Sequence, residues 1–176
     1  MWINQQQRGT FETTLSQEEK SYLKDLESAT DKKLPQGEKL YRSVDAEAVF
    51  GKMSDMDYEN LVNAIVFKNN DKFSAAAKNK YVNNAMGKTI TDKGFMSTST
   101  SYNLTKDFND FTGSSKPVVI EFTTGKNTKG INLQKSFPKL ESRMGQKETL
   151  LKNNTSFKIK DISSRDGNIY IKADLS

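Results

Sequence analysis

The chain has 176 residues, 34% of them hydrophobic and 28% charged, a composition typical of one polar but folded domain over residues 1–176. It contains no cysteine and no histidine, which excludes disulfide scaffolds, Cys/His zinc sites, thiol nucleophiles and histidine-dependent triads. The net charge of +5 comes from scattered lysines, so a solvated surface is favoured over a specific nucleic-acid site. Since no apolar run could span a bilayer and no metal-ligand cluster is visible, we expect neither a membrane partner nor a metal.

The first half of the chain has the apolar spacing of helices, with one short strand among them. Ser16 followed by Glu19 predicts a capping box at the start of the first helix, and Gly87 ends the last one. The predicted elements are a helix at 16–28, a strand at 39–44, a helix from residue 54 or 55, and a helix at 71–86. The side chains predicted to form the apolar faces of these helices are Tyr22, Leu23, Leu26, Met56, Leu61, Ala64, Ile65, Val66, Phe73, Ala76, Ala77, Tyr81 and Ala85.

The second half, from Gly94 onward, has the pattern of strands separated by turns rich in Gly, Asn, Lys and Asp. The predicted strands are 94–99, 117–124, 130–133, 148–152, 156–163 and 168–174. Asp166-Gly167, between the last two strands, is a strong signal for a hairpin. Helices followed by strands, without alternation between the two, predict an α+β fold with an antiparallel sheet.

Three segments carry residues suited to chemistry. They are Leu40-Tyr41-Arg42-Ser43, the Ser97-Thr98-Ser99 run in strand 94–99, and Gln146-Lys147-Glu148 before an apolar strand. Each motif alone arises often by chance, but the three in this order on predicted strands form a specific combination. The combination resembles the Arg/Ser-Thr-Ser/Glu class of mono-ADP-ribosyltransferases and is most similar to the small Rho-modifying clostridial exoenzymes.

The resemblance implies an enzyme that uses NAD as co-substrate, transfers ADP-ribose to a protein side chain and also hydrolyses NAD slowly. It implies N-terminal helices packed on two antiparallel sheets that flank an NAD cleft. By the same resemblance we expect a bacterial or phage-encoded monomer that acts on a host protein, with a small GTPase as the candidate. Such an enzyme is secreted, delivered into a host cell or phage-associated, although residues 1–10 lack the apolar core of a signal peptide.

Glu148 is the predicted catalytic carboxylate. Cleavage of the nicotinamide–ribose bond passes through an oxocarbenium-like state, and a carboxylate near the ribose stabilises the positive charge as it develops. Ser97 is expected to hydrogen-bond this carboxylate and keep it aimed, while Thr98 and Ser99 hold the strand at the nicotinamide ribose. If the Gln-x-Glu motif is considered by itself, Glu148 is better explained as a solvated residue at a strand edge. The three motifs together favour a catalytic role for it.

Arg42 is one of only four arginines in a chain that otherwise uses lysine. Its guanidinium can grip a pyrophosphate through two parallel hydrogen bonds, which lysine cannot, and Tyr41 is assigned to the same NAD site. The alternative for Arg42 is a structural ion pair with a nearby carboxylate. From the resemblance, Phe111 is expected to stack on the nicotinamide and Lys116 to cover the phosphates.

Gln146 is the residue expected to select the acceptor. In the family that the chain resembles, transferases that modify arginine carry Glu at this position and those that modify asparagine carry Gln. A Gln can exchange donor and acceptor bonds with an asparagine amide, whereas a protonated arginine needs a carboxylate. We therefore expect an asparagine acceptor, with Arg143 and Phe137 of the preceding loop recognising the protein target.

Two alternatives of different classes stay open. One is a catalytically weak or inactive binding module on the same scaffold, because a fold does not guarantee activity. The other is an active transferase with a different acceptor, such as arginine, water, nucleic acid or a host protein other than a GTPase.

Overall fold

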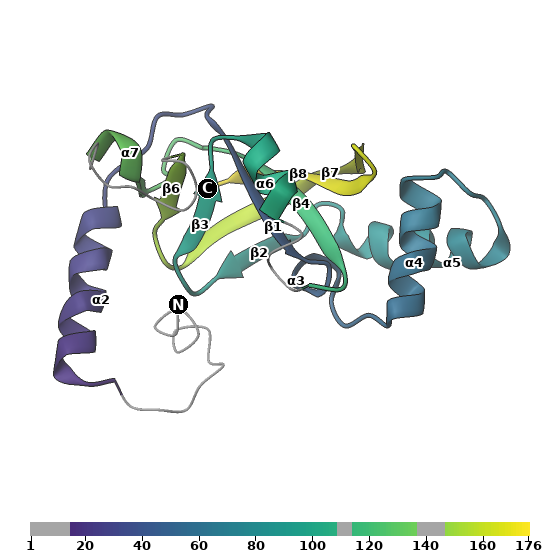
Figure 1. Ribbon diagram of the computed structural model, residues 1–176, viewed down its shortest axis with the longest axis horizontal. Coiled ribbons are helices and arrows are strands. Elements are labelled where there is room, and N and C mark those ends of the chain that lie inside the picture. The colour runs from purple at the N-terminus through teal and green to yellow at the C-terminus, as the bar shows by residue number, and fades with distance from the viewer. Residues whose placement is uncertain (1–14, 109–113, 137–146) are drawn as a thin grey trace.

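The computed structural model of the chain describes residues 15–108, 114–136 and 147–176. A helical first half precedes a strand-rich second half, which confirms the α+β class (Figure 1). The first half contains α2 (Gln17–Thr30), β1 (Lys39–Asp45), α3 (Glu47–Phe50), α4 (Asp55–Ile65), α5 (Lys72–Ala85), β2 (Thr89–Asp92) and β3 (Met96–Ser99). The second contains α6 (Tyr102–Phe108), β4 (Pro117–Thr123), β5 (Gly130–Asn132), α7 (Leu133–Ser136), β6 (Glu148–Leu151), β7 (Thr155–Arg165) and β8 (Asn168–Leu175).

The helices begin at polar caps. The predicted capping box of α2 is present, since the Ser16 N–H donates to Glu19 Oε2 (2.6 Å) and the Glu19 N–H donates to Ser16 Oγ (3.2 Å). Ser54 caps α4 and Asp71 caps α5, each with a side-chain oxygen that accepts from backbone N–H groups. In the part of the chain that is described, no helix is both long and apolar enough to cross a membrane.

The buried faces of the helices differ from the prediction at several positions. Tyr22, Met56 and Phe73 are exposed, and Ala76 is exposed as well. The buried residues of α5 are Ser74, Ala77, Tyr81 and Ala85. These buried residues follow one another at the helical spacing of three or four positions. The series begins at Ser74 and not at Phe73, so the ring of Phe73 points away from the core.

The strands form one hydrogen-bonded series in the order β2-β7-β8-β4-β1-β3-β6-β5. The two expected sheets are therefore joined into one. The connection is a single pair of residues, Tyr41 on β1 and Ser99 on β3. A further difference is that β4 and β8 are parallel, whereas the prediction was antiparallel throughout. Parallel pairing joins strands far apart in the chain, so no local turn signals it. The predicted hairpin is confirmed, with Asp166 (φ 50°) and Gly167 (φ 78°) both left-handed, as a type I′ turn requires.

The two faces of β1 meet different surroundings. Leu40 faces the main core, which includes residues of α3, α4 and α5. Tyr41 faces the other way, into a smaller cluster with Tyr102, Val119 and Tyr170. Because side chains alternate along a strand, Arg42 is on the same side as Leu40.

Candidate active site

Ser97 and Glu148 meet across the pair of strands β3 and β6. The register places Ser99 opposite Glu148 and Ser97 opposite Leu150, so Ser97 and Glu148 are diagonal neighbours on one face. Ser97 Oγ donates to Glu148 Oε1 over 2.6 Å, and both residues are half-buried. The hydrogen bond that the sequence predicted between them is therefore present.

The opposite face of the same strand pair fixes its geometry. Thr98 and Thr149 are buried there, and Thr98 Oγ1 donates to the Thr149 carbonyl oxygen over 2.6 Å. The Thr100 N–H donates to the Lys147 carbonyl oxygen (2.9 Å), which continues the pairing beyond Glu148. Thr98, expected at the nicotinamide ribose, is thus engaged in joining β3 to β6, and it holds the strand that carries Ser97.

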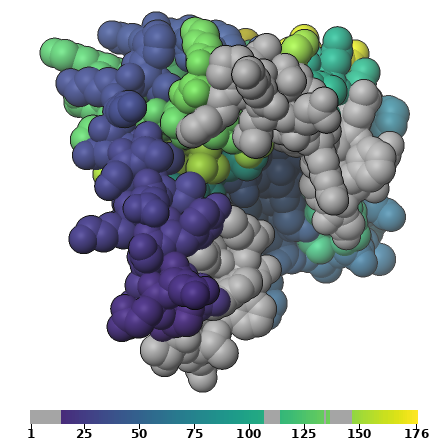
Figure 2. Space-filling model, turned by 60° about the vertical axis from the view of Figure 1, so that its left-hand side comes forward, coloured from purple at the N-terminus to yellow at the C-terminus, as the bar shows by residue number. Residues whose placement is uncertain are grey.

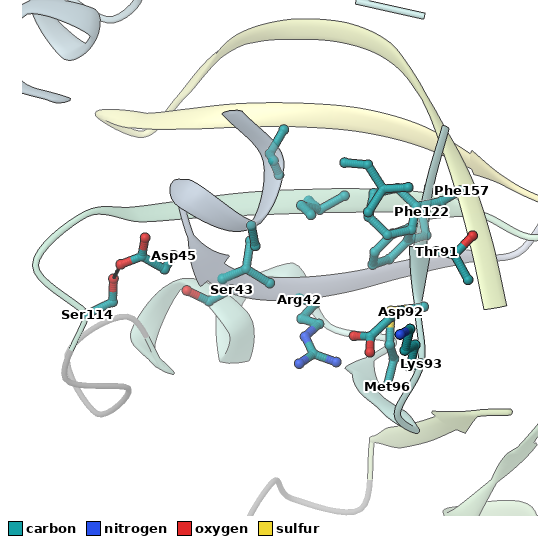
Figure 3. A pocket seen from close by; sticks show the side chains of 15 residues that line it. Arg42, Ser43, Asp45, Thr91, Asp92, Lys93, Met96, Ser114, Phe122 and Phe157 are labelled. Carbon is teal, nitrogen blue, oxygen red and sulfur yellow. Dashed lines mark hydrogen bonds between the residues drawn. The ribbon is translucent and has the colours of Figure 1, made fainter. Parts of the chain in front are cut away.

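Arg42 lines a cavity of about 630 Å³ beside the sheet. Figure 3 shows its guanidinium close to Asp92, Lys93 and Met96. The other lining residues are Ser43, Val44, Asp45, Ala48, Val49, Ile90, Thr91, Ser114, Ile120, Phe122 and Phe157. Two cations, Arg42 and Lys93, and an apolar wall in the same concavity suit a ligand with both an anionic and a flat apolar part, although Asp45 and Asp92 also line it. Figure 2 shows a surface hollow that α2 borders, with a floor in the blue colours of the first half of the chain.

The three motifs lie on neighbouring strands. Tyr41 pairs with Ser99, and Ser99 pairs with Glu148, so one row of residues crosses β1, β3 and β6. Arg42 directly follows this row on β1, and Met96, which lines the cavity, directly precedes Ser97. Ser97 and Glu148 themselves are not part of the described cavity lining. The structure thus places the three motifs on neighbouring strands, with Arg42 in the cavity lining and the Ser97–Glu148 pair in the row that contains Tyr41.

Tyr41 does not share the face of Arg42. Its ring packs edge-to-face on Tyr102, with ring centroids 5.8 Å apart, and the Arg165 guanidinium lies 3.6 Å from the Tyr102 ring centre. Burial, together with the hydrogen bond to Asp166, raises the pKa of Tyr102 to about 12, so this phenol stays neutral. Burial also raises the pKa of Tyr170. Tyr41 was assigned to NAD, but it lies in this aromatic cluster, which fastens α6 to the sheet.

Lys116, expected over the phosphates, lies outside the described cavity lining. Its ammonium is 3.4 Å from Asp55 Oδ1 and 3.6 Å from Glu47 Oε1. Burial lowers its pKa, but the hydrogen bond to Asp55 and the nearby carboxylates outweigh that effect and raise it. Ser114 lines the cavity instead and donates to Asp45 Oδ2 over 2.6 Å. Asp45 and Ser114 were not predicted from the sequence. The position of Asp45 at the end of β1, the strand that contains Arg42, could have indicated that it lies near the site.

Four predicted residues lie outside the described residues: Gln146, Arg143, Phe137 and Phe111. The described chain resumes at Lys147, directly before Glu148. Over the described ranges, no group of three or more acidic side chains is arranged to hold a metal ion.

Comparisons with known proteins show the family and the fold of the chain. A family model described as ADP-ribosyltransferase exoenzyme matches residues 3–176. The fold is similar to that of an ADP-ribosyltransferase from Clostridium botulinum, at 23% identity and a TM-score of 0.67, covering 99% of this chain and 79% of that one. It is also similar to the larvin toxin, an ADP-ribosyltransferase from Paenibacillus larvae (21% identity, TM-score 0.58, coverage 99% and 80%). A protein from S. aureus, solved with NAD, is similar as well (21%, 0.63, coverage 92% and 73%).

No curated protein sequence matches the chain. At these identities the solved structures show the fold alone. The match to the family model shows which family the chain belongs to. Because that model spans nearly the whole chain, the chain belongs to the ADP-ribosyltransferase exoenzymes and is an NAD-dependent mono-ADP-ribosyltransferase.

Proposed function

We propose that the chain transfers ADP-ribose from NAD to an asparagine side chain of a host protein, and that it hydrolyses NAD slowly when no acceptor is bound. The observation that carries the catalytic part is the 2.6 Å hydrogen bond from Ser97 to Glu148 on two paired strands. A carboxylate held in this way needs little reorganisation when positive charge develops beside it.

Glu148 acts on the ribose. The bond between C1′ of the ribose and the nicotinamide nitrogen breaks, its electron pair stays with nicotinamide, and nicotinamide leaves as a neutral molecule. The carboxylate stabilises the oxocarbenium-like ribose, and Ser97 keeps it aimed. The acceptor's amide nitrogen then bonds to C1′ and loses one proton to the solvent.

The remaining roles concern binding and choice of acceptor. Arg42 holds the pyrophosphate, since its guanidinium is the cation of the cavity that can form two parallel hydrogen bonds to phosphate oxygens. Phe111 stacks on the nicotinamide. Gln146 exchanges hydrogen bonds with the acceptor amide, and Arg143 and Phe137 contact the target protein.

The test is incubation of the purified chain with labelled NAD and either a host-cell lysate or a panel of small GTPases. Mass spectrometry should find ADP-ribose on asparagine, and Glu148→Gln should abolish both labelling and nicotinamide release. Label on arginine, or on agmatine supplied as a free acceptor, would overturn the asparagine assignment. If nicotinamide release persisted in Glu148→Gln, the catalytic assignment would be wrong. If the chain bound NAD but neither transferred ADP-ribose nor hydrolysed NAD, it would be an inactive binding module.

A further inference from the structure

The turn that joins α4 to α5 exposes two large aromatic side chains. Phe67 follows the last residues of α4 and is 71% exposed, and Phe73 lies in the first turn of α5 and is 70% exposed. Single exposed apolar residues are common, but two phenylalanines at the ends of one short turn form a local apolar tip. Figure 1 shows α4 and α5 at one end of the long axis of the molecule, with β6 toward the other end.

A second cavity, of about 430 Å³, lies beside this tip. It is lined by Lys68 and Lys78 from the helical side and by Ser163 and Ser164 of β7. The rest of the lining is Ala64, Ile65, Asn70, Val82 and Ile162, so the cavity has two cations and no carboxylate. Ammonium and hydroxyl groups without a competing acid suit a phosphate group.

The backbone of the turn is held in an unusual conformation at one of these lysines. Lys68 has φ 53°, in the left-handed region where helix ends usually carry glycine, and the Asn69 N–H donates to the Asn63 carbonyl oxygen (2.9 Å). A lysine at this position costs conformational energy that glycine would not, and its side chain lines the cavity.

The acidic residue of the turn is already engaged. Asp71 caps α5, with Oδ1 accepting from the Phe73 and Ser74 N–H groups and Oδ2 from Ser74 Oγ, over 2.9–3.0 Å. Lys72 is exposed beside it. The tip and the cavity beside it therefore combine two aromatic rings with three lysines, Lys68, Lys72 and Lys78, and the carboxylate of Asp71 is the acidic group of the turn.

We propose that this tip docks on an anionic phospholipid surface, with Phe67 and Phe73 in the interfacial layer and Lys68 and Lys78 at headgroup phosphates. Aromatic rings favour the bilayer interface, and lysines near it are attracted by anionic lipids. The sequence predicted no membrane partner because it lacks a spanning run, but surface docking requires none. Since β6 lies toward the other end of the molecule, docking leaves the Ser97–Glu148 pair accessible.

The test is cosedimentation of the full chain with vesicles of phosphatidylcholine alone and of phosphatidylcholine with phosphatidylserine. We expect sedimentation with the anionic vesicles only. Combining Phe67→Ser with Phe73→Ser should weaken it by about tenfold or more. Lys78→Glu should weaken it by about fivefold or more. The matched controls are Met56→Ser, which is 72% exposed at the far end of α4, and Lys126→Glu, on an exposed turn; both should bind as the unchanged chain does.

Several outcomes would overturn the proposal. They are absence of sedimentation, equal binding to neutral vesicles, and equal losses in the tip and control variants. Phosphate or inositol phosphate binding at Lys68 and Lys78 without vesicle binding would assign the cavity to a soluble anion instead. The readout needs no NAD, so it is independent of the proposed acceptor and catalytic residues.

Discussion

Replacing Ser97 by Ala removes the hydrogen bond to Glu148 and leaves the carboxylate in place. The 2.6 Å distance is that of a charge-assisted O–H···O⁻ bond, and such bonds contribute about 1.5–3 kcal/mol. Both residues are half-buried, so water can replace part of the lost interaction, and the lower end of this range applies. A loss of about 1.5 kcal/mol in the transition state corresponds to a kcat about tenfold lower.

The assay is nicotinamide release at saturating NAD, with Kd for NAD measured separately by calorimetry. Because Ser97 acts through Glu148, the expected loss is in kcat, with Kd nearly unchanged.

A matched control exists on α5, where Ser74 Oγ donates to the Asp71 carboxylate over 2.9 Å. Ser74→Ala removes the same kind of bond far along the chain from Glu148, so it should lower Tm without changing kcat. The reasoning is refuted if Ser97→Ala keeps kcat within about twofold, or if the variant loses NAD affinity instead of kcat.

Three further predictions concern NAD binding, acceptor choice and acid stability. Arg42→Lys should raise Kd for NAD about tenfold, because one of two parallel hydrogen bonds to the pyrophosphate is lost; an unchanged Kd by calorimetry would contradict this. Gln146→Ala should keep NAD hydrolysis but remove protein labelling, and equal losses in both assays would exclude an acceptor role. Hydrogen bonds from Lys129 and Lys152 lower the pKa of Asp31 from 3.8 to about 2, so its contribution to stability is complete above about pH 4 and is lost as the pH falls toward 2. Asp31→Asn should therefore flatten the dependence of Tm on pH in that window, and an unaltered profile would contradict the pairing.

The strands and their motifs could be predicted because local patterns specify them. The strands at 156–163 and 168–174 were predicted and correspond to β7 and β8, and Asp166-Gly167 marked the turn between them. The Ser97–Glu148 contact was predicted from the need to aim the carboxylate, and the structure shows that the strands of the two motifs pair directly. Short elements such as α3 and β2, of four residues each, have too few positions for a periodic signal.

Side-chain direction was harder to predict than secondary structure. Arg42 and Tyr41 are adjacent in the sequence, yet alternation sends one to the cavity and the other to the aromatic cluster on the opposite face. Phe73 is apolar and helical, yet the stripe of α5 that faces the core passes one position away. Such choices depend on which surface packs against each element, and that surface is formed by residues distant in the chain.

Bond cleavage and acceptor choice are separable on the roles proposed for Gln146 and Glu148. The strand of Glu148 is fixed by pairing with β3, and the hydrogen bond from Thr100 to Lys147 extends that pairing one residue toward Gln146. Gln146 stands two residues before Glu148 and lies outside the described residues, so its proposed role at the acceptor rests on the alternation expected along a strand. We therefore expect substitutions in the segment before Lys147 to change the acceptor without moving the carboxylate that is proposed to stabilise the ribose.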